Sequence, residues 1–486
     1  MVLNEEELAK LLVDFNPWWN NGKIEDIPKF RRMDFGPLTV RLNDSEVTAI
    51  IGARQVGKTT LMKQLIEYLL DRGIESNHVL YILGDSVDLN LATDKPIQDS
   101  LSAYQKYFLK KTFLDNKEKV YVFIDEAQKI SNWSGILKNF VDLHKNIKFM
   151  VSGSSSTKIF QNGVESLVGR FQKQIVVPFK FLEAIRFVNF NKDKDGDKFV
   201  SLKYRLREKF RNAVKNGDIK SLFKEFERSR TDFLAHESEL EIILNDYFIK
   251  GGYPKIITTD DQRKCKEILT TNIENIIKMD IRETFGITDT LTLQKLVKLL
   301  SINSSDRANI ENLSKILDKK RDTIERYLSH LEDAYIISIS SFYTGNITSR
   351  TKKSKKIYIN DVGMRNVLNN SFDPVLVQSD IGKIAETVAF NHCLRFCFNL
   401  NPGTKPCLYY WQDALGNEVD IILEYFKKPV PIEVKYRTKI DSDELKGLNA
   451  FIKEKSAQFG ICITKNTLEI RDNIILVPAW LFFIMC

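Results

Sequence analysis

The sequence predicts an α/β protein of several domains with a parallel sheet in its N-terminal part. Three mostly apolar runs, at residues 47–51, 120–124 and 147–151, are typical of buried parallel strands. Each run ends in polar or glycine-rich sequence, and the first leads into residues 61–70, whose apolar spacing is helical. Because the chain has 486 residues, we expect several domains rather than one core.

A glycine-rich loop connects the first strand to its helix. It reads Gly52-Ala53-Arg54-Gln55-Val56-Gly57-Lys58-Thr59-Thr60. In such a loop, backbone N–H groups surround phosphate oxygens and the helix N-terminus adds a partial positive charge. Lys58 is expected to reach the β- and γ-phosphates, and Thr59 to hold Mg²⁺. The sequence therefore predicts a nucleoside-triphosphate site with the binding residues Gly52, Gln55, Val56, Gly57, Lys58, Thr59 and Thr60.

Polar residues follow the next two strands. Asp125 and Glu126 come directly after residues 120–124, which places them beside the phosphate loop if the strands are parallel. Asp125 is then expected to hold the Mg²⁺ shell and Glu126 to polarise the attacking water, which indicates hydrolysis rather than passive binding. Ser152 could sense the γ-phosphate or position the water. Arg170 is a candidate for stabilising charge in the transition state, or else a solvated loop residue.

Residues 286–360 contain a candidate DNA-binding module. Two short helices, at 310–317 and 321–331, are separated by a turn and followed by a strand, a basic segment at 349–356 and a return strand. This order is typical of a winged helix. Its second helix would expose Arg321, Thr323, Arg326 and Tyr327, and the basic hairpin could contact phosphate. Such modules also serve for packing or protein binding, and both interpretations stay open.

The C-terminal part carries a second set of chemical groups. Residues 382–390 predict a buried helix bearing Glu386, and residues 416–423 a strand containing Asp420. In the following strand Glu433 and Lys435 are two residues apart, so both point to one face. Asp420 and Glu433 could share one or two hard cations, because carboxylate oxygens suit such ions. Lys435 could orient or deprotonate a water, and Glu386 could complete the cluster.

At these residues the chain resembles a known family. The motifs are Asn16-Pro17-Trp18-Trp19, the phosphate loop, Asp125-Glu126, Ser152-Gly153-Ser154-Ser155, Gly169-Arg170 and Gly251-Gly252-Tyr253-Pro254. They are similar to those of the archaeal and bacterial AAA-type ATPases often grouped with the signal-transduction NTPase clade. The resemblance runs from about Asn16 to the C-terminus and implies ATP as the nucleotide and a hydrolysis role for Arg170.

The resemblance also implies a C-terminal domain of uncharacterised function that is similar to PD-(D/E)xK nucleases. Glu386, Asp420, Glu433 and Lys435 fill every position of that motif, although the usual proline before the strand aspartate is absent. The predicted fold is thus a P-loop parallel-sheet ATPase domain with a helical insertion, a winged helix and a restriction-endonuclease-like α/β domain.

We expect five parts along the chain. They are an N-terminal segment (1–36) whose Trp18-Trp19 pair packs onto the ATPase, a P-loop AAA-type ATPase core (37–185), a helical lid or insertion (186–285), a winged helix (286–360) and a nuclease-like domain (361–486). Two functions fit this order. One is ATP-gated DNA processing; the other is a nucleotide-driven switch or scaffold whose nuclease-like domain only binds nucleic acid or protein. A homo-oligomer fits both, since Arg170 could act within its chain or across a subunit boundary.

Composition narrows these expectations. The net charge of +8 is modest for the length, so a DNA-binding surface must be local. Six cysteines without paired metal spacing predict reduced, mostly buried thiols in a cytoplasmic protein. Residues 1–12 lack a signal-peptide pattern, and the apolar run 474–486 is too short to cross a bilayer. We therefore expect no membrane contact, and we expect the last run to close a domain core.

Overall fold

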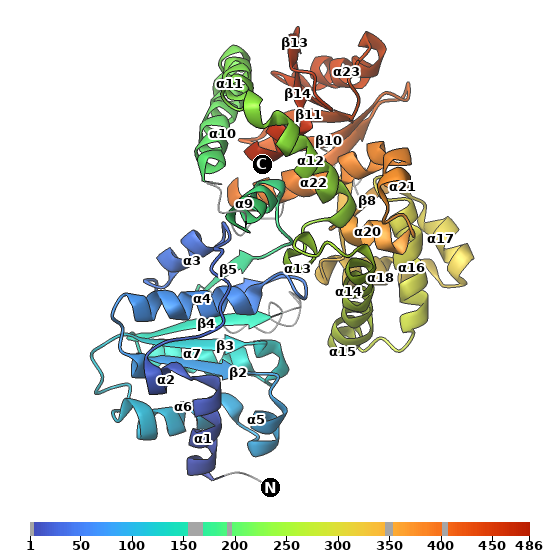
Figure 1. The fold of residues 1–486 in the computed structure, drawn as a ribbon. Coiled ribbons are helices and arrows are strands. Elements are labelled where there is room, and N and C mark those ends of the chain that lie inside the picture. The colour runs from blue at the N-terminus through green and yellow to red at the C-terminus, as the bar shows by residue number, and fades with distance from the viewer. Residues whose placement is uncertain (1–3, 154–168, 192–196, 346–352, 401–406) are drawn as a thin grey trace. The chain divides into compact units, whose positions relative to one another are not determined.

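The chain divides into two units, which are described separately. The computed structural model describes residues 4–153, 169–191, 197–345, 353–400 and 407–486. The first unit comprises Met1–Val177 with Glu283–Gly286, and the second comprises Pro178–Arg282 with Ile287–Cys486 (Figure 1). The predicted helical insertion, winged helix and nuclease-like domain thus fall almost entirely into one unit, and the finer five-part division stays a prediction.

The first unit is built on a five-stranded parallel sheet in the order β2-β3-β4-β1-β5. Its strands are β1 (Val47–Ile51), β2 (Val79–Leu83), β3 (Val120–Asp125), β4 (Ile147–Gly153) and β5 (Phe171–Ile175). Every residue of β1, β3 and β4 is buried, which is the pattern of parallel strands covered on both faces. The predicted strands and their parallel arrangement are confirmed.

Helices surround this sheet. They are α1 (Glu5–Phe15), α2 (Trp18–Asn21), α3 (Phe35–Arg41), α4 (Lys58–Asp71), α5 (Val87–Ala92), α6 (Pro96–Tyr104) and α7 (Trp133–Leu143). Helix α4 follows β1 through the glycine-rich loop. Its first residue comes after Gly57, whose φ of 96° lies in the region that favours glycine. The predicted strand, loop and helix are therefore present.

The segment before the sheet covers the edge strand β2. Asn16 acts like a strand residue there: its Oδ1 accepts from the Tyr81 backbone N–H at 2.6 Å, and its Nδ2 donates to the Tyr81 carbonyl at 2.9 Å. The indole N–H groups of Trp18 and Trp19 donate to the Val79 carbonyl at 3.1 and 2.9 Å. Helices α1, α2 and α6 lie beside this edge (Figure 1). The expected packing of the tryptophan pair is confirmed, and it satisfies the open edge.

The second unit contains a nine-stranded sheet in the order β13-β14-β12-β11-β10-β9-β7-β8-β6. Its strands are β6 (Arg307–Ala308), β7 (Ile337–Phe342), β8 (Lys355–Ile359), β9 (Leu408–Gln412), β10 (Glu418–Tyr425), β11 (Lys428–Lys435), β12 (Gly460–Thr464), β13 (Glu469–Arg471) and β14 (Ile474–Pro478). Strands β7 and β9 pair in parallel through Ser341 with Tyr409 and Phe342 with Tyr410. The hairpin of the predicted winged helix is therefore continuous with the sheet of the predicted nuclease-like domain.

The helices of this unit complete its core. They are α9 (Phe181–Asn191), α10 (Lys198–Asn216), α11 (Ile219–Asp232), α12 (Glu237–Lys250), α13 (Pro254–Ile257), α14 (Gln262–Asn275), α16 (Thr290–Ile302), α17 (Ile310–Leu317), α18 (Arg321–Asp333), α20 (Val362–Leu368), α21 (Pro374–Ser379), α22 (Ile381–Leu400), α23 (Lys446–Lys455) and α24 (Ala479–Met485). Helix α15 (Arg282–Phe285) is divided between the units: Arg282 belongs to the second unit, and its remaining residues belong to the first. The charged helices α10 and α11 bury an apolar face in the same core as β10, β11 and α22, so they are more than a solvated insertion.

The predicted helices and strands at 310–359 are present, but two expectations about their side chains are wrong. Tyr327 is buried rather than exposed, because it packs on the same face of α18 as Ile324, Leu328 and Leu331. Arg321 and Arg326 are exposed and Thr323 is half-buried. Lys356, which was assigned to the basic hairpin, is buried, and residues 349–352 lie outside the described residues.

The C-terminal run is core, as predicted. Strand β14 and helix α24 are buried along their whole length. All six cysteines are free thiols, and five of them are buried. Among the residues that the structure describes, no helix has both the length and the apolar character needed to cross a bilayer.

Replacing Asn16 by alanine should destabilise the first unit by about 2–4 kcal/mol, because two buried backbone groups of Tyr81 lose their partners. Urea unfolding followed by circular dichroism and tryptophan fluorescence measures this change. Asn20→Ala is the matched control, since Asn20 is exposed in α2. Equal stability of the two variants would contradict the proposed role of the Asn16 amide.

Candidate functional site

Close backbone packing, positive φ angles and hydrogen bonds from an arginine fix the conformation of the phosphate loop in the first unit. Gly52 has no room for a side chain, because a Cβ there would lie 1.8 Å from the Val176 carbonyl oxygen. Gln55 and Gly57 both have positive φ angles, 60° and 96°, which curl the loop. The buried Arg32 donates through Nη1 to the Val56 carbonyl at 2.7 Å and through Nη2 to the Val177 carbonyl at 2.8 Å. Arg32 was not found from the sequence, where it stands in an irregular basic segment.

Lys58 lies inside this loop at the start of α4. Its Nζ donates to the Gly52 carbonyl at 3.1 Å and to the Ala53 carbonyl at 2.9 Å, and the residue is only 5% exposed. The ammonium group is thus already positioned at the centre of the loop. Phosphate oxygens can replace these carbonyl contacts without a large movement of the side chain.

Asp125 accepts hydrogen bonds from several of the other predicted residues of the nucleotide site. Its Oδ2 accepts from Thr59 Oγ1 at 2.7 Å and from the Tyr81 hydroxyl at 2.8 Å. Its Oδ1 accepts from Ser152 Oγ and from the Glu126 backbone N–H. The structure therefore brings Thr59, Asp125 and Ser152 together, as the carboxyl ends of parallel strands require. Ser154 and Ser155 lie outside the described residues.

Two further groups near Asp125 escaped sequence reasoning. Burial, and then the charge of Asp125, raises the pKa of Tyr81, so Tyr81 remains a hydroxyl donor. Burial, followed by the charges of Glu126 and Asp125, raises the pKa of the Asp85 carboxyl. Asp85 follows Gly84, where a Cβ would approach the Asp125 carbonyl oxygen to 2.8 Å. The Gly84-Asp85 pair after β2 was the available sequence signal.

Glu126 has an unusual backbone. Its φ of 49° is left-handed, a conformation that costs a non-glycine residue about 1–3 kcal/mol and is concentrated at functional sites. Its N–H donates to Ser152 Oγ at 3.1 Å, and its Oε2 accepts from Gln128 Nε2 at 2.5 Å. These contacts fix both the backbone and the carboxylate of Glu126 beside Asp125.

Arg170 lies at the other end of the sheet. Its carbonyl accepts from the Val47 backbone N–H at 2.8 Å, at the start of β1, whereas the phosphate loop follows the end of β1. The five residues of β1 separate these ends by about 16 Å at about 3.3 Å per residue, beyond the reach of an arginine side chain. Arg170 pairs with Asp142 at 2.5 Å. A contact of Arg170 with the nucleotide of its own chain is therefore excluded, which corrects one of the two predicted alternatives.

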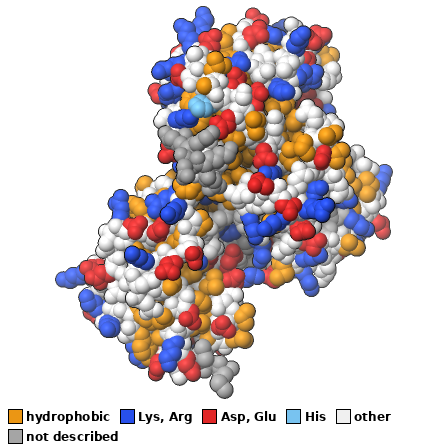
Figure 2. Space-filling model, viewed as in Figure 1, with side chains coloured by type: hydrophobic (Ala, Val, Ile, Leu, Met, Phe, Trp, Pro, Cys, Tyr) orange, Lys and Arg blue, Asp and Glu red, His pale blue; other side chains and the backbone are white. Residues whose placement is uncertain are grey.

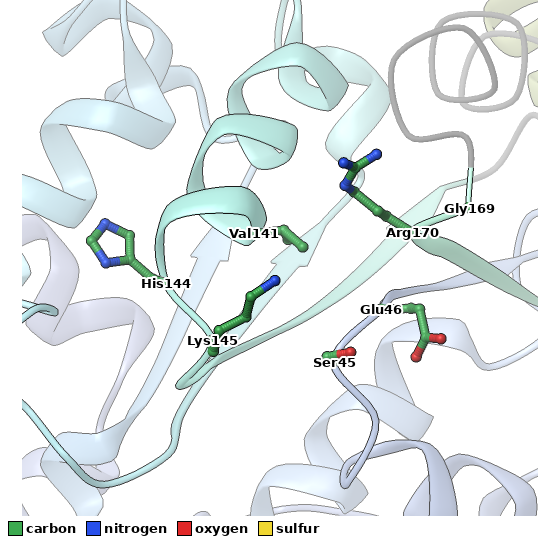
Figure 3. A pocket seen from close by; sticks show the side chains of 7 residues that line it. All are labelled: Ser45, Glu46, Val141, His144, Lys145, Gly169 and Arg170. Carbon is green, nitrogen blue, oxygen red and sulfur yellow. The ribbon is translucent and has the colours of Figure 1, made fainter.

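Arg170 lines a small pocket in the first unit, which Figure 3 shows together with its other lining residues. The lining residues are Ser45, Glu46, Val141, His144, Lys145, Gly169 and Arg170. They belong to the segments that enter β1, β4 and β5 and to the end of α7. The pocket thus opens at the amino ends of the strands, opposite the phosphate loop.

In the second unit, strands β10 and β11 bring Asp420, Glu433 and Lys435 together. The Asp420 N–H donates to Glu433 Oε2 at 3.3 Å, and the Val434 N–H donates to Asp420 Oδ2 at 3.0 Å. Lys435 Nζ lies 2.6 Å from Glu433 Oε1. These contacts follow from antiparallel pairing around Ile421 and Ile432, which places the two carboxylates on neighbouring strands.

Lys356 on β8 joins this cluster from the hairpin of the predicted winged helix. Its Nζ lies 2.6 Å from Glu418 Oε1, 3.2 Å from Glu386 Oε1 and 3.3 Å from Asp420 Oδ1. The Tyr358 hydroxyl donates to the same Glu386 oxygen at 3.0 Å. Lys356 and Tyr358 are two residues apart on one strand, so they share a face; this spacing was the signal that sequence reasoning missed.

Burial and mutual repulsion perturb these groups. Burial, and then the charge of Asp420, raises the pKa of Glu433 to about 8 and that of Glu386 to about 7. Burial alone would lower the pKa of Lys356, but Tyr358, Glu386, Asp420 and Glu418 raise it well above its usual value. Four carboxylates (Glu386, Glu418, Asp420 and Glu433) thus face the two ammonium groups of Lys356 and Lys435, and negative charge is in excess.

The donor set of Asp420 and Glu433 fits a hard divalent cation. Both residues offer carboxylate oxygens, and the excess of negative charge favours a cation. Mg²⁺ is commonly bound through one or two carboxylates with water or phosphate completing the shell. Among the described residues, three potential metal ligands converge within 4.8 Å of one another only at Glu75, His78 and Glu118. There the two ring nitrogens of His78 face different carboxylates, at 3.6 and 2.9 Å.

The predicted nucleotide site lies in a region that matches a known protein family. Residues 44–185 match a family described as an AAA domain, and residues 242–374 and 381–482 match two domains of unknown function, DUF8612 and DUF4143. An uncharacterized protein of Methanocaldococcus jannaschii is 24% identical over 443 residues, covering 90% of this chain and 85% of the relative. An uncharacterized protein of Haemophilus influenzae is 25% identical over 332 residues, covering 67% and 70%.

Two solved structures are also similar. The Walker-type ATPase of Pyrococcus abyssi has 16% identity and a TM-score of 0.39, covering 72% of this chain and 97% of that one. The Aeropyrum pernix ORC2 protein in its ADP form has 13% identity and a TM-score of 0.31, covering 74% and 97%.

The matched AAA region contains all five strands of the first sheet and every predicted nucleotide-site residue, including Lys58, Asp125 and Ser152. The hydrogen-bonded group around Asp125 lies within this matched region. The chain therefore contains an AAA-type P-loop ATPase domain, followed by two domains of unknown function.

Proposed function

We propose that the protein is a Mg²⁺-dependent ATPase that gates the binding and cleavage of DNA by its second unit. The observation that carries the proposal is the partly buried cluster of Glu386, Asp420, Glu433 and Lys435 in the same chain as an assembled nucleotide site. Holding the buried Glu433 close to the half-buried Glu386 and Asp420 is costly unless the site uses these carboxylates.

In the first unit, the residues divide the work of hydrolysis. Lys58 would exchange its carbonyl contacts for β- and γ-phosphate oxygens, and Thr59 with Asp125 would hold Mg²⁺. Bound Mg²⁺ would neutralise charge on the phosphates. Glu126, held by Gln128 and by its own backbone, is the group that would orient and polarise water, with Ser152 fixing its position.

In the second unit, Asp420 and Glu433 would hold a divalent cation that polarises a phosphodiester. Lys435, 2.6 Å from Glu433, would orient a water or take its proton. DNA must be held locally, because Lys and Arg are interspersed with Asp and Glu over the face in Figure 2. The exposed Arg321 and Arg326 of α18 are candidate phosphate contacts.

A nucleotide-driven switch or scaffold is the second candidate. The observation that favours it is the ion pairing of Lys356, whose ammonium group contacts three of the carboxylates without any metal ion. The burial of Tyr327 also removes one predicted base or phosphate contact from α18. In this alternative the second unit binds nucleic acid or protein without cleaving it.

Lys58→Ala should lower ATP affinity at least tenfold, whereas Glu126→Gln should retain affinity within about threefold and lose turnover. The reason is that Lys58 contacts the phosphates in every bound state, while Glu126 acts only on the attacking water. Fluorescent-nucleotide titration and phosphate release measure the two effects. A similar loss of affinity in both variants would contradict this division of roles.

Arg170→Ala should keep the nucleotide affinity of the chain, because Arg170 lies at the opposite end of the sheet. If it acts at all, it acts across a subunit boundary, so mixing Arg170→Ala with Lys58→Ala protein should restore part of the lost turnover. Lys145→Ala, in the same pocket, is the control. Loss of turnover in Arg170→Ala without any recovery on mixing would exclude the role across subunits.

Asp420→Ala should abolish DNA cleavage while leaving ATP hydrolysis intact. The assay uses plasmid, linear and four-way-junction DNA with Mg²⁺ or Mn²⁺, with and without ATP. Asp443→Ala is the control, because Asp443 is an exposed carboxylate that pairs with Lys446. Cleavage that also disappears in Lys58→Ala would establish gating by ATP. If the wild type cleaves none of these substrates, the switch is the remaining function.

A further inference from the structure

The ammonium group of Lys356 lies among three carboxylates of the second unit. Oxygens of Glu386, Glu418 and Asp420 surround it at 2.6–3.3 Å, and its side chain is only 5% exposed. Glu418 is not part of the predicted motif, yet it makes the shortest of these contacts. Three carboxylates from α22 and β10 thus converge on one positive charge from β8.

We propose that Lys356 takes the place of one metal ion in this cluster, so that the site accepts a single divalent cation, at Asp420 and Glu433. The inference rests on the proposed function of the second unit, in which Asp420 and Glu433 hold a cation. The sequence predicts one or two cations at Asp420 and Glu433, and the inference reduces this number to one.

The contacts of the individual oxygens support a single remaining site. Glu386 Oε1 accepts from both Lys356 and Tyr358, so both electron pairs of this oxygen are engaged. Glu418 is held at one oxygen by Lys356 and lies 3.5 Å from Arg307 at the other. A metal ion bound by these same oxygens at about 2 Å would coincide with the ammonium group.

Lys356 is also fixed in place by its strand. It stands opposite Ser340 on β7 and opposite Arg307 on β6, so β8 is paired on both sides at this residue. Its ammonium group cannot leave the cluster by local fraying of an edge strand. The positive charge is therefore a permanent part of the site, unlike a metal ion that exchanges with solvent.

A lysine and a metal ion differ in what they contribute. The ammonium group donates hydrogen bonds and neutralises charge on a phosphate, but it does not generate a hydroxide as a metal-bound water does. The site would therefore use one divalent cation for the water or the phosphoryl oxygen and Lys356 as a fixed counter-charge. The substrate class that fits is a phosphodiester, which carries one negative charge at the reacting group.

The test is a count of bound Mn²⁺ in the full-length, nucleotide-free protein, by calorimetry and electron paramagnetic resonance. Ions that disappear in Asp420→Asn protein are assigned to the cluster. Wild-type protein should bind one such ion. Lys356→Gln should bind one more, with the affinity for the first ion at least tenfold higher, because a positive charge near Asp420 is removed.

Two matched variants sharpen the comparison. Lys355→Gln removes the same charge from the neighbouring residue of β8, whose side chain points to the opposite face, and should leave the count at one. Lys356→Arg keeps the charge and should also bind no second ion. A second ion in wild-type protein, or none gained in Lys356→Gln, overturns the inference.

Thermal unfolding shows whether a missing second ion in Lys356→Gln protein is caused by a folding defect. Lys356→Gln should have a lower melting temperature than wild type in a metal chelator, and Mn²⁺ should raise it more than it raises that of wild type. If the variant folds in neither condition, Mn²⁺ does not replace the ammonium group and the inference is wrong. If wild type binds no ion and Lys356→Gln binds one, the single cation at Asp420 and Glu433 is absent, and both the inference and the metal-dependent part of the proposed function fail; a second ion in wild type overturns the inference alone.

Discussion

A carboxylate that is buried away from water must find hydrogen-bond donors or a cation, and this requirement organises both units. Asp125 is 1% exposed and satisfies it with the hydroxyls of Thr59, Tyr81 and Ser152 and the N–H of Glu126. These donors come from α4, β2, β4 and the residue after β3, so they also tie the strand ends together. The geometry of the nucleotide site is therefore a consequence of one buried charge.

The same requirement explains the Gly251-Gly252-Tyr253-Pro254 motif. Asp361 is buried in the second unit, and its Oδ2 accepts from the Gly252 N–H at 2.8 Å while its Oδ1 accepts from the Met364 N–H at 3.1 Å. A Cβ on Gly251 would lie 2.3 Å from this carboxylate, and φ at Gly251 is 74°. The motif is thus more than a turn, because its glycines let the backbone reach a buried carboxylate.

Sequence patterns predicted the groups that neighbour one another along a strand or at strand ends. The positions of Asp125, Ser152, Asp420, Glu433 and Lys435 follow from strand direction and from the two-residue repeat of a strand. Lys356 was missed because its partners are distant in sequence and its basic neighbours indicated a solvated hairpin. Arg170 was a candidate for the nucleotide site from its spacing and the family resemblance, and β5, Phe171–Ile175, was not predicted because three consecutive polar residues, 172–174, do not indicate a buried strand. Without β5, the end of the sheet to which Arg170 belongs could not be assigned.

The charge balance of the second unit connects its two candidate functions. Four carboxylates face Lys356 and Lys435, so the excess negative charge is balanced either by protons or by an added cation. Burial and the charge of Asp420 raise the pKa of Glu433 to about 8, so near neutral pH a proton occupies this carboxyl for much of the time. A divalent cation at Asp420 and Glu433 must displace that proton, and cation binding therefore strengthens as pH rises through this range. A cluster without a cation, in which Lys356, Lys435 and protons on Glu386 and Glu433 balance the four carboxylates, holds no metal-bound water and is inert, which is what a binding platform requires. In the proposed function the same cluster with one cation would hydrolyse a phosphodiester, so on this proposal the occupancy of one cation position separates the two functions.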